Sequence, residues 1–268
     1  MQYDVAIVGG GIIGCAIARE LSRFSLETIL LEAQPDVGSG TTKANGGLVH
    51  SGYDPAPGTV KAQVNATGNR LYRQWSKELG FSFNQNGSLV LGFNDEDLEH
   101  IRMLWANGRA AGIDDLEIVR GNAIRELEPA ATEEAKYALH CPHTGVVDPY
   151  EVAIACAENA AQNGVPIKTH FPVREIQHTS DGFIIASDRE EVRAKLLINA
   201  AGAHADEIAK MYGDNSFELS WRQGNLLVFD KKCGLGDIKA IYPVPTKTTK
   251  GVVVIGSVHG NTLVGSPE

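Results

Sequence analysis

The chain opens on an apolar run at residues 3–8 that predicts a short strand. A glycine-rich turn follows at residues 9–14, and residues 15–24 have the composition of a helix. A second apolar run at residues 28–31 predicts another strand, which ends at Glu32. The pattern predicts a strand, a tight turn, a helix and a second strand, which is the start of an α/β fold.

Apolar positions beyond this unit alternate between the helical period and the strand period. Val60, Val64, Leu71, Trp75 and Leu79 lie near a 3.6-residue repeat and predict a helix over residues 59–79. The other predicted helices cover residues 94–111, with Leu98, Ile101, Leu104 and Trp105 buried, and residues 122–127 and 149–163. The predicted strands of this region cover residues 87–93, 116–119, 136–141, 145–147 and 165–169.

The last third of the chain is dominated by strands. Residues 173–177, 183–187 and 192–195 have the spacing of an antiparallel meander. The third run continues through residues 196–199, which predicts a strand buried on both faces, and a helix follows to about residue 212. Four later runs, at residues 225–229, 240–242, 252–255 and 262–264, predict a separate antiparallel sheet.

Composition narrows the class of protein. The chain has 268 residues, 43% of them hydrophobic, and a net charge of −9, which disfavours nucleic acid as a main partner. It contains no run of 18 apolar residues, and its N-terminal residues lack the basic start of a signal peptide. The four cysteines are scattered without a C-x-x-C pair, so we expect free thiols, a cytoplasmic location and no metal site.

The first turn carries candidate chemistry. Gly9, Gly11 and Gly14 form a G-x-G-x-x-G motif, and Glu32 lies 18 residues after Gly14. The glycines allow a tight turn, close approach of the backbone to a pyrophosphate and close helix–strand packing, while the helix N-terminus favours phosphate. Glu32 can accept hydrogen bonds from ribose hydroxyls. The unit predicts an adenine-dinucleotide site, which the first turn alone assigns neither to NAD nor to FAD.

Later segments favour FAD. Residues 33–53 form a long glycine-rich loop, where a short return to a third β-α unit would be expected of an NAD enzyme. The segment LLINAAG at residues 196–202 repeats the strand-then-turn pattern, directly after the predicted meander. The layout is that of a Rossmann-like flavoprotein domain, so the predicted fold is α/β, and α+β when the separate sheet is included.

Six segments resemble those of a known family. They are YDVAIVGGGIIGCAIARELSR, TTKANGGLVHSGYDPAPGTVKAQVNATGN, NGSLVLGF, GVVDPYEVAIACAENAAQNGV, LLINAAGAHADEIAKM and VHGNTLVGSPE. The chain resembles FAD-dependent oxidoreductases of the D-amino-acid-oxidase-like superfamily, in the branch of glycerol-3-phosphate dehydrogenase and L-2-hydroxyglutarate oxidase. The GLVHSGY core of the second segment is the most specific to this branch.

The resemblance implies a set of cofactor-binding residues. Gly9, Gly11, Ile13 and Gly14 would hold the pyrophosphate, and Glu32 the AMP ribose. Ala33 follows Glu32 in the same set. The remaining implied contacts are Thr41, Thr42, Asn45, Gly47 and Leu48 on the flavin side, Val173 at adenine, and Ala201 and Gly202 at a second approach of the backbone.

His50 is the candidate catalytic residue. It lies in the loop that the resemblance places beside the flavin ring, and related glycerol-phosphate oxidases use a histidine at this motif position as the base. Oxidation of a secondary alcohol requires a group that accepts the hydroxyl proton, and imidazole has a suitable pKa. An equally weighted alternative is that His50 only hydrogen-bonds the backbone or a flavin carbonyl.

Candidate substrate-binding residues lie in the predicted second sheet. An anionic substrate favours an arginine fork, which Arg222 could supply, with Tyr242 and Lys247 nearby in the sequence. His259, in the VHGN segment, could contact substrate or flavin. The predicted domains are residues 1–80 and 142–216 for FAD, and residues 81–141 and 217–268 for substrate.

The resemblance also implies a function. We expect oxidation of a small anionic 2-hydroxy compound, glycerol 3-phosphate first and L-2-hydroxyglutarate second, with electrons passing to a quinone, a partner flavoprotein or oxygen. Alternatives are an amine oxidase of the glycine-oxidase type and an inactive cofactor-binding fragment, because relatives continue past residue 268. Peripheral association with a membrane stays open.

Overall fold

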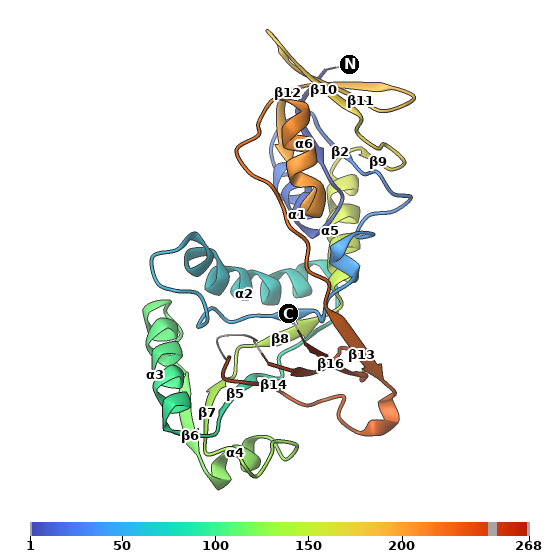
Figure 1. Cartoon of the computed structure of the whole chain (residues 1–268). Helices are drawn as coiled ribbons and strands as arrows, with labels where there is room; N and C mark the ends of the chain where they lie inside the picture. The colour runs from blue at the N-terminus through green and yellow to red at the C-terminus, as the bar shows by residue number, and fades with distance from the viewer. Residues whose placement is uncertain (1, 246–250, 267–268) are drawn as a thin grey trace. The chain divides into compact units, whose positions relative to one another are not determined.

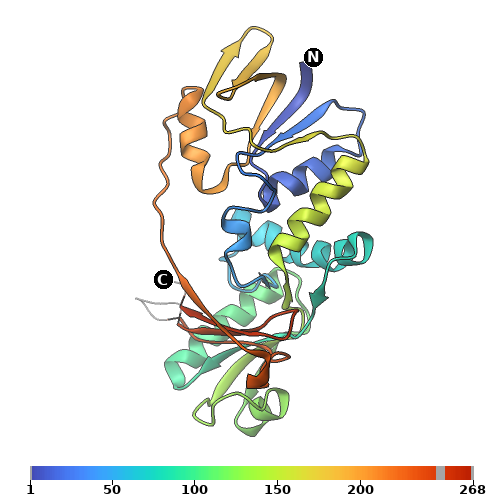
Figure 2. The ribbon, with the colours of Figure 1, turned by 90° about the vertical axis from the view of Figure 1, so that its right-hand side faces the viewer.

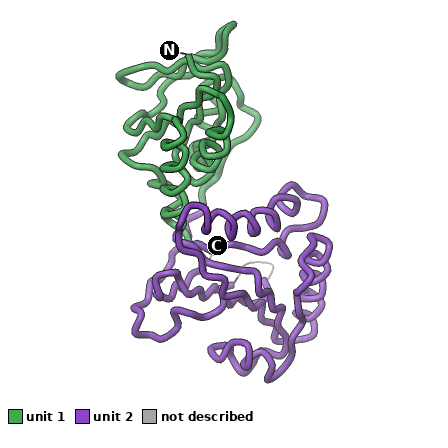
Figure 3. The backbone as a smooth tube through the Cα atoms, turned by 180° about the vertical axis from the view of Figure 1, so that it is seen from behind, with its two compact units in different colours: residues 1–45, 149–221 green, residues 46–148, 222–268 purple. Residues whose placement is uncertain are grey.

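The computed structural model describes residues 2–245 and 251–266. The chain forms two compact units, unit 1 with residues 1–45 and 149–221 and unit 2 with residues 46–148 and 222–268 (Figure 3). These bounds differ from those predicted from the sequence, because residues 46–80 belong with the second unit by their contacts. The predicted division into cofactor and substrate domains is a statement about binding, and it stays a prediction.

Unit 1 is built on a six-stranded sheet in the order β10-β11-β12-β1-β2-β9 (Figure 1). The four strands β12, β1, β2 and β9 run parallel, and β10, β11 and β12 form the predicted antiparallel meander. The expected strand at residues 165–169 is reduced to two residues. The strands are β1 (Gln2–Val8), β2 (Thr28–Leu31), β9 (Ile167–Lys168), β10 (Glu175–Thr179), β11 (Gly182–Ala186) and β12 (Glu191–Asn199).

Helices cover both faces of this sheet, as Figure 2 shows. Helix α6 (Ala205–Met211) packs on one face of the sheet. Its Ile208 belongs to one hydrophobic core cluster with Ala6 and Val8 of β1. Helices α1 (Ile12–Leu21) and α5 (Pro149–Gln162) pack together on the other face. Two single 3-10 turns, η1 (Thr41–Lys43) and η2 (Gly202–His204), complete the unit. The layers are those of a doubly wound fold.

Unit 2 contains a seven-stranded sheet in the order β13-β16-β15-β14-β5-β7-β6. Neighbouring strands are antiparallel except β14 and β5, which are parallel. The sheet therefore agrees with the predicted antiparallel sheet in all but one pairing. Its strands are β5 (Ser88–Gly92), β6 (Glu117–Arg120), β7 (Tyr137–Cys141), β13 (Asn225–Phe229), β14 (Ala240–Pro243), β15 (Val253–Gly256) and β16 (Thr262–Ser266).

A second, three-stranded sheet of unit 2 brings distant segments together. Strand β8 (Gly145–Val147) pairs antiparallel with both β3 (Leu48–Val49) and β4 (Phe83–Asn84). The helices of the unit are α2 (Val60–Leu79), α3 (Asp95–Ala110) and α4 (Asn122–Leu127), with a 3-10 turn η3 (Lys231–Cys233). Helices α2 and α3 begin after Thr59 and Asn94, because the side chains of these two residues accept hydrogen bonds from the amides of Ala62 and Asp97.

The apolar positions near the start of helix α2 are exposed. Val60 is 72% exposed and Val64 is 58% exposed, whereas Ala66 and Asn69 are the buried residues of the helix. The helix packs its other face on the loop that follows β3. There Gly52 lies so close to Ala66 that a Cβ on the glycine would be 3.0 Å from the alanine Cβ.

Two burial predictions were wrong. Trp105 is 38% exposed, although its indole nitrogen donates to the carbonyl of Leu116, so it lies at the edge of its cluster. Leu196 is 61% exposed, so β12 is not buried on both faces along its final residues.

Candidate functional site

The Gly9–Gly14 turn of unit 1 has no room for side chains at two positions. Gly9 has φ of +110°, and a Cβ there would lie 2.3 Å from the carbonyl oxygen of Ala200. A Cβ on Gly14 would lie 1.8 Å from the carbonyl oxygen of Gly9. The predicted roles of tight turn and close helix packing therefore have a direct steric basis.

Glu32 is already engaged by the turn. Its Oε2 accepts from the Gly10 amide at 2.6 Å and its Oε1 from the Gln34 amide at 2.8 Å. The residue is only 9% exposed. Each carboxylate oxygen keeps a second lone pair, so Glu32 can still accept from ribose hydroxyls while it holds the two loops together.

The loop after Glu32 folds back over the same turn. The Thr42 hydroxyl accepts from the Ile12 amide at 3.0 Å, at the start of helix α1. Asn45 donates from Nδ2 to the carbonyls of Thr41 and Thr42. The amides of Gly11 and Ile13 find no acceptor among the described residues, so two donors stay available beside a helix N-terminus.

The chain returns to this turn a second time at residues 200–202. The Ala200 amide donates to the Val8 carbonyl at 2.8 Å, and Ala201 Cα lies 2.9 Å from a Cβ placed on Gly9. Gly202 has φ of +57° and adjoins the hydroxyl of Thr41. The structure thus brings together the predicted pyrophosphate turn and the predicted second approach of the backbone.

The segment predicted to meet adenine runs beside Glu32. The amides of His170 and Phe171 donate to the carbonyls of Gln34 and Glu32, while the Val173 side chain packs on the sheet. A cavity of about 550 Å³ opens next to this segment. It is lined by Ala33, His170, Pro172, Ser187, Asp188 and Arg189.

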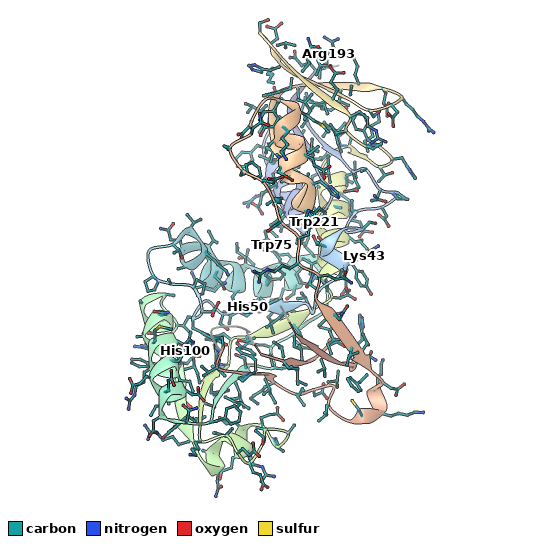
Figure 4. The ribbon with its side chains drawn as sticks, viewed as in Figure 1. Lys43, His50, Trp75, His100, Arg193 and Trp221 are labelled. Carbon is teal, nitrogen blue, oxygen red and sulfur yellow. The ribbon has the colours of Figure 1, made fainter. Side chains whose placement is uncertain are left out.

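In unit 2, the segment from Gly47 to Tyr53 is held from several sides. The Val147 amide donates to the Gly47 carbonyl, and Asn69 donates from Nδ2 to the carbonyls of His50 and His143. His50 lies beside helix α2 with its side chain exposed (Figure 4), whereas the three residues after it are buried. A small cavity of about 80 Å³ is lined by His50, Ser51, Asp54, Lys61 and Asn65, among others.

A run of hydroxyl groups lies below this segment. Ser51 and Ser88 both hydrogen-bond the hydroxyl of Thr144, at 2.6 and 2.8 Å. Ser88 also contacts the Tyr53 hydroxyl at 3.1 Å, and Tyr53 contacts the Tyr242 hydroxyl. Burial raises the pKa of the Tyr242 hydroxyl, so it stays protonated near neutral pH. Tyr242, predicted to bind substrate, is thereby linked to the loop that carries His50.

The predicted substrate residue His259 is paired with a buried acid. Its Nε2 lies 2.7 Å from Oδ2 of Asp148, which is 5% exposed, while the imidazole itself is 55% exposed. The other carboxylate oxygen, Oδ1, has no hydrogen-bond partner among the described residues. The contact occupies Nε2, so Nδ1 is the ring nitrogen that remains for another partner.

This pair lies next to the predicted flavin-side residues of unit 2. Asp148 follows directly after β8, whose Val146 pairs with Leu48. Ile255, four residues before His259, would lie 3.1 Å from a Cβ on Gly46. Leu48 and Tyr242 pack against the same core cluster as Ile255. Four predicted residues thus converge in unit 2: Gly47, Leu48, Tyr242 and His259.

Sequence reasoning missed several residues of this region. The missed residues are Asp148, Asn69, Ser88 and Thr144. No local signal marks the hydroxyls. The single available hint was an acid immediately after a buried strand, the position where functional side chains emerge at a sheet edge.

Two predicted residues are not brought to the site by any described contact. Arg222 is exposed and makes no hydrogen bond or ion pair with a described residue. Lys247 lies outside the described residues. Among residues 2–245 and 251–266, no cluster of three or more His, Cys, Asp or Glu side chains could hold a metal ion. Within the same ranges no helix is both long and apolar enough to cross a membrane.

Comparison with known proteins identifies relatives along the whole chain. The model of the family described as FAD dependent oxidoreductase matches residues 4–268. A glycerol 3-phosphate dehydrogenase of Caloramator mitchellensis is 39% identical over 264 residues, covering 98% of this chain and 55% of the relative. A mitochondrial L-2-hydroxyglutarate dehydrogenase of Homo sapiens is 31% identical, covering 91% of this chain and 56% of the relative.

A solved structure agrees with the fold. Dithionite-reduced L-α-glycerophosphate oxidase from Mycoplasma pneumoniae, with FAD bound, superimposes with a TM-score of 0.92 at 33% identity. The match covers 99% of this chain and 71% of that structure. The mixed α/β fold with its additional sheet is therefore confirmed, and the chain spans about half the length of the two sequence relatives named above.

Proposed function

This chain belongs to the FAD dependent oxidoreductase family. We propose that it forms part of an enzyme of this family and that this enzyme oxidises glycerol 3-phosphate. The observation that carries the proposal is the 39% identity to a glycerol 3-phosphate dehydrogenase across 98% of the chain. FAD is the cofactor of the family, as the sequence predicted.

The residues of unit 1 fit FAD. The turn is closed to side chains at Gly9 and Gly14, as a backbone surface for a pyrophosphate requires. The amides of Gly11 and Ile13 would donate to phosphate oxygens, supported by the positive end of the α1 dipole. Glu32 would accept from the ribose while Gly10 and Gln34 hold its carboxylate in place.

His50 supplies the proton-accepting group in this proposal. FAD held by the unit 1 residues would supply the hydride-accepting group for oxidation at the carbinol carbon. An imidazole nitrogen of His50 takes the hydroxyl proton of the substrate. The C–O bond then becomes a carbonyl without passing through a protonated, positively charged carbonyl. The exposed side chain on a firmly anchored loop suits this role, because the group must reach substrate while its backbone stays fixed.

His259 and Asp148 would bind the acidic group of the substrate. The buried carboxylate of Asp148 orients the imidazole of His259 through Nε2, so that the Nδ1 side of the ring would contact the phosphate or carboxylate of the substrate. Tyr242 and Arg222 were predicted for the same purpose, and the contacts of Tyr242 favour a supporting role.

The test is anaerobic reduction of the bound flavin. Purified holoprotein mixed with glycerol 3-phosphate should lose its oxidised flavin absorbance, and glycerol should have no effect at the same concentration. Bleaching by glycine or proline and not by glycerol 3-phosphate would replace the proposal with an amine oxidase. Failure of every compound, with FAD bound, would support a fragment that binds the cofactor without turnover.

L-2-hydroxyglutarate is the second candidate substrate. It is favoured by the 31% identity to the human L-2-hydroxyglutarate dehydrogenase, and it shares an acidic group next to a carbinol carbon with glycerol 3-phosphate. The ratio of bleaching rates with the two compounds decides between them. A ratio above one for L-2-hydroxyglutarate would overturn the order proposed here.

Electron acceptor and location belong to the same proposal. We assign the electrons to a quinone, a partner flavoprotein or oxygen, which reoxidation of the reduced protein by each in turn would distinguish. The four free cysteines suit the reducing cytoplasm, with peripheral association to a membrane as one arrangement. Cell fractionation tests this location, and recovery with an oxidising compartment would contradict it.

A further inference from the structure

The five hydroxyl-bearing residues Ser51, Thr144, Ser88, Tyr53 and Tyr242, here called the hydroxyl chain, form one continuous hydrogen-bonded run in unit 2. Ser51 and Tyr53 belong to the loop after β3, and Thr144 precedes β8. Ser88 begins β5, and Tyr242 lies in β14, the parallel neighbour of β5. The hydroxyl chain therefore ties one loop to strands β5 and β14 and to the residue that precedes β8.

Core packing alone does not explain this arrangement. Ser51 is 3% exposed, Thr144 1%, Ser88 0% and Tyr53 4%. Buried hydroxyls stabilise a fold little in comparison with apolar groups of the same shape, because their desolvation offsets most of the hydrogen-bond energy. What a satisfied buried network does provide is a unique arrangement of the segments it joins.

The segment that the hydroxyl chain fixes is the one that carries His50. Residues 51–53 are buried, and His50 directly before them is exposed. Asn69 of helix α2 holds the His50 carbonyl at 3.3 Å, and Gly52 lies against Ala66 of the same helix. The helix and the hydroxyl chain together leave the His50 imidazole as the exposed side chain of this short stretch.

We propose that the hydroxyl chain positions His50, with Tyr242 as its far anchor acting through Tyr53. This inference rests on the proposed function, because positioning matters only if His50 takes the substrate proton. The hydroxyls themselves touch no reacting atom in this account. They set the direction of the loop, and a misplacement of about 1 Å at a reacting group costs up to about 100-fold in rate.

The pattern of bonds predicts which substitutions are coupled. Tyr242→Phe removes one contact, that with Tyr53, whereas Tyr53→Phe removes that contact and the one with Ser88. The double variant therefore breaks no bond that Tyr53→Phe leaves intact. We expect Tyr242→Phe to lower kcat by about 3-fold. Tyr53→Phe should lower kcat by about 10-fold, and the double variant should lower it no further than Tyr53→Phe alone.

Thr144 gives a matched pair of variants. Thr144→Ser keeps the hydroxyl that bonds Ser51 and Ser88, and Thr144→Val removes it at nearly constant volume. Thr144→Ser should retain at least about half of kcat, and Thr144→Val should lose about 10-fold with KM within about 2-fold. Tyr212→Phe in unit 1, outside the hydroxyl chain, is the control and should leave kcat unchanged.

The decisive experiment combines turnover per bound FAD with NMR of the holoprotein labelled in histidine. The His50 ring resonances, assigned with a His50→Gln variant, should move in Tyr53→Phe and Thr144→Val and stay in place in Thr144→Ser and Tyr212→Phe. Unmoved resonances, or additive losses in the double variant, would overturn the inference. Absence of flavin reduction by glycerol 3-phosphate in the wild-type protein would instead refute the proposed function, and the NMR result would still judge the positioning.

Discussion

Asp148 holds His259 through a 2.7 Å contact between Oδ2 and Nε2, and the acid is buried while the imidazole is exposed. A second pair, Asp115 and His143, has nearly the same length, 2.8 Å, but its acid is 49% exposed. The two pairs differ in solvent access to the carboxylate rather than in distance. Exposed ion pairs contribute little to the free energy of folding because water screens them. Of these two pairs, we therefore expect only that of Asp148 to hold its histidine in a fixed orientation.

Asp148→Asn removes the carboxylate that orients the imidazole of His259. We expect KM for an anionic substrate to rise about 10-fold with kcat changed by less than about 3-fold, since binding of the acidic group is affected before proton transfer. Asp115→Asn is the matched control and should leave both constants unchanged. Steady-state kinetics of the two variants measure this, and equal effects of both substitutions would contradict the role given to Asp148.

Gly9→Ala should abolish FAD binding. The new Cβ would meet the Ala200 carbonyl oxygen at 2.3 Å, at a backbone φ of +110° that alanine adopts poorly. Gly68→Ala, in the interior of α2 with nothing within 4 Å of the new Cβ, should stabilise the protein by about 0.5–1 kcal/mol. Flavin content and thermal unfolding of both variants give the comparison. A yellow, wild-type-like Gly9→Ala protein would show that the turn has more freedom than the structure indicates.

Glu32→Gln should weaken FAD binding and loosen two loops. Glutamine presents one oxygen and one NH₂ group where Glu32 accepts from the amides of Gly10 and Gln34, so one of these amides faces a donor. The expected loss is about 1–3 kcal/mol of folding free energy, together with about 10-fold weaker FAD binding. Denaturant unfolding and flavin titration measure the two effects. The exposed Glu96→Gln serves as control, and a silent Glu32→Gln would remove Glu32 from the site.

The thiols of the chain should differ in their reactivity with an alkylating reagent according to their burial. Burial raises the pKa of Cys15 to about 12 and that of Cys156 to about 11, from a usual value of 9.0, whereas Cys233 is exposed. At pH 8 an alkylating reagent should modify Cys233 alone until the protein is denatured. Mass spectrometry of the labelled protein checks this. Labelling of Cys15 in the native state would contradict its burial.

The same shifts have a consequence for stability at high pH. A thiol whose folded pKa exceeds its unfolded pKa stabilises the folded state in its protonated form, so the contribution is complete below pH 9.0. It is lost as the pH rises from 9.0 towards about 12 for Cys15. Cys15→Ala should therefore flatten the fall in melting temperature over this alkaline range.

Much of the fold of unit 1 was predictable because its signals are local. The turn at residues 9–14, the apolar runs on either side and the meander each declare themselves within a few residues. The repeated strand-then-turn pattern at residues 196–202 predicted a second approach of the backbone to the dinucleotide, and the structure places residues 200 and 201 against Gly9. The position of each loop atom was not, since Thr42 bonding to Ile12 depends on where a long loop folds.

Unit 2 was harder to predict because its site is assembled from contacts far apart in sequence. Asp148 and His259 are separated by 111 residues, and Tyr53 and Tyr242 by 189. No periodicity reports such pairings. The buried face of helix α2 was not predictable from its apolar repeat for a related reason. Asn69 is buried and holds the His50 carbonyl, whereas Val60 and Val64 are exposed to solvent.

The most direct test of the central claim is the rate of flavin reduction in rapid anaerobic mixing of glycerol 3-phosphate with wild-type holoprotein and with His50→Gln. We predict complete bleaching of the wild-type flavin and a rate about 100-fold lower in the variant at equal FAD content, because the proton acceptor is lost. Equal rates in the two proteins would remove His50 from catalysis. No bleaching in the wild type would contradict oxidation of this substrate.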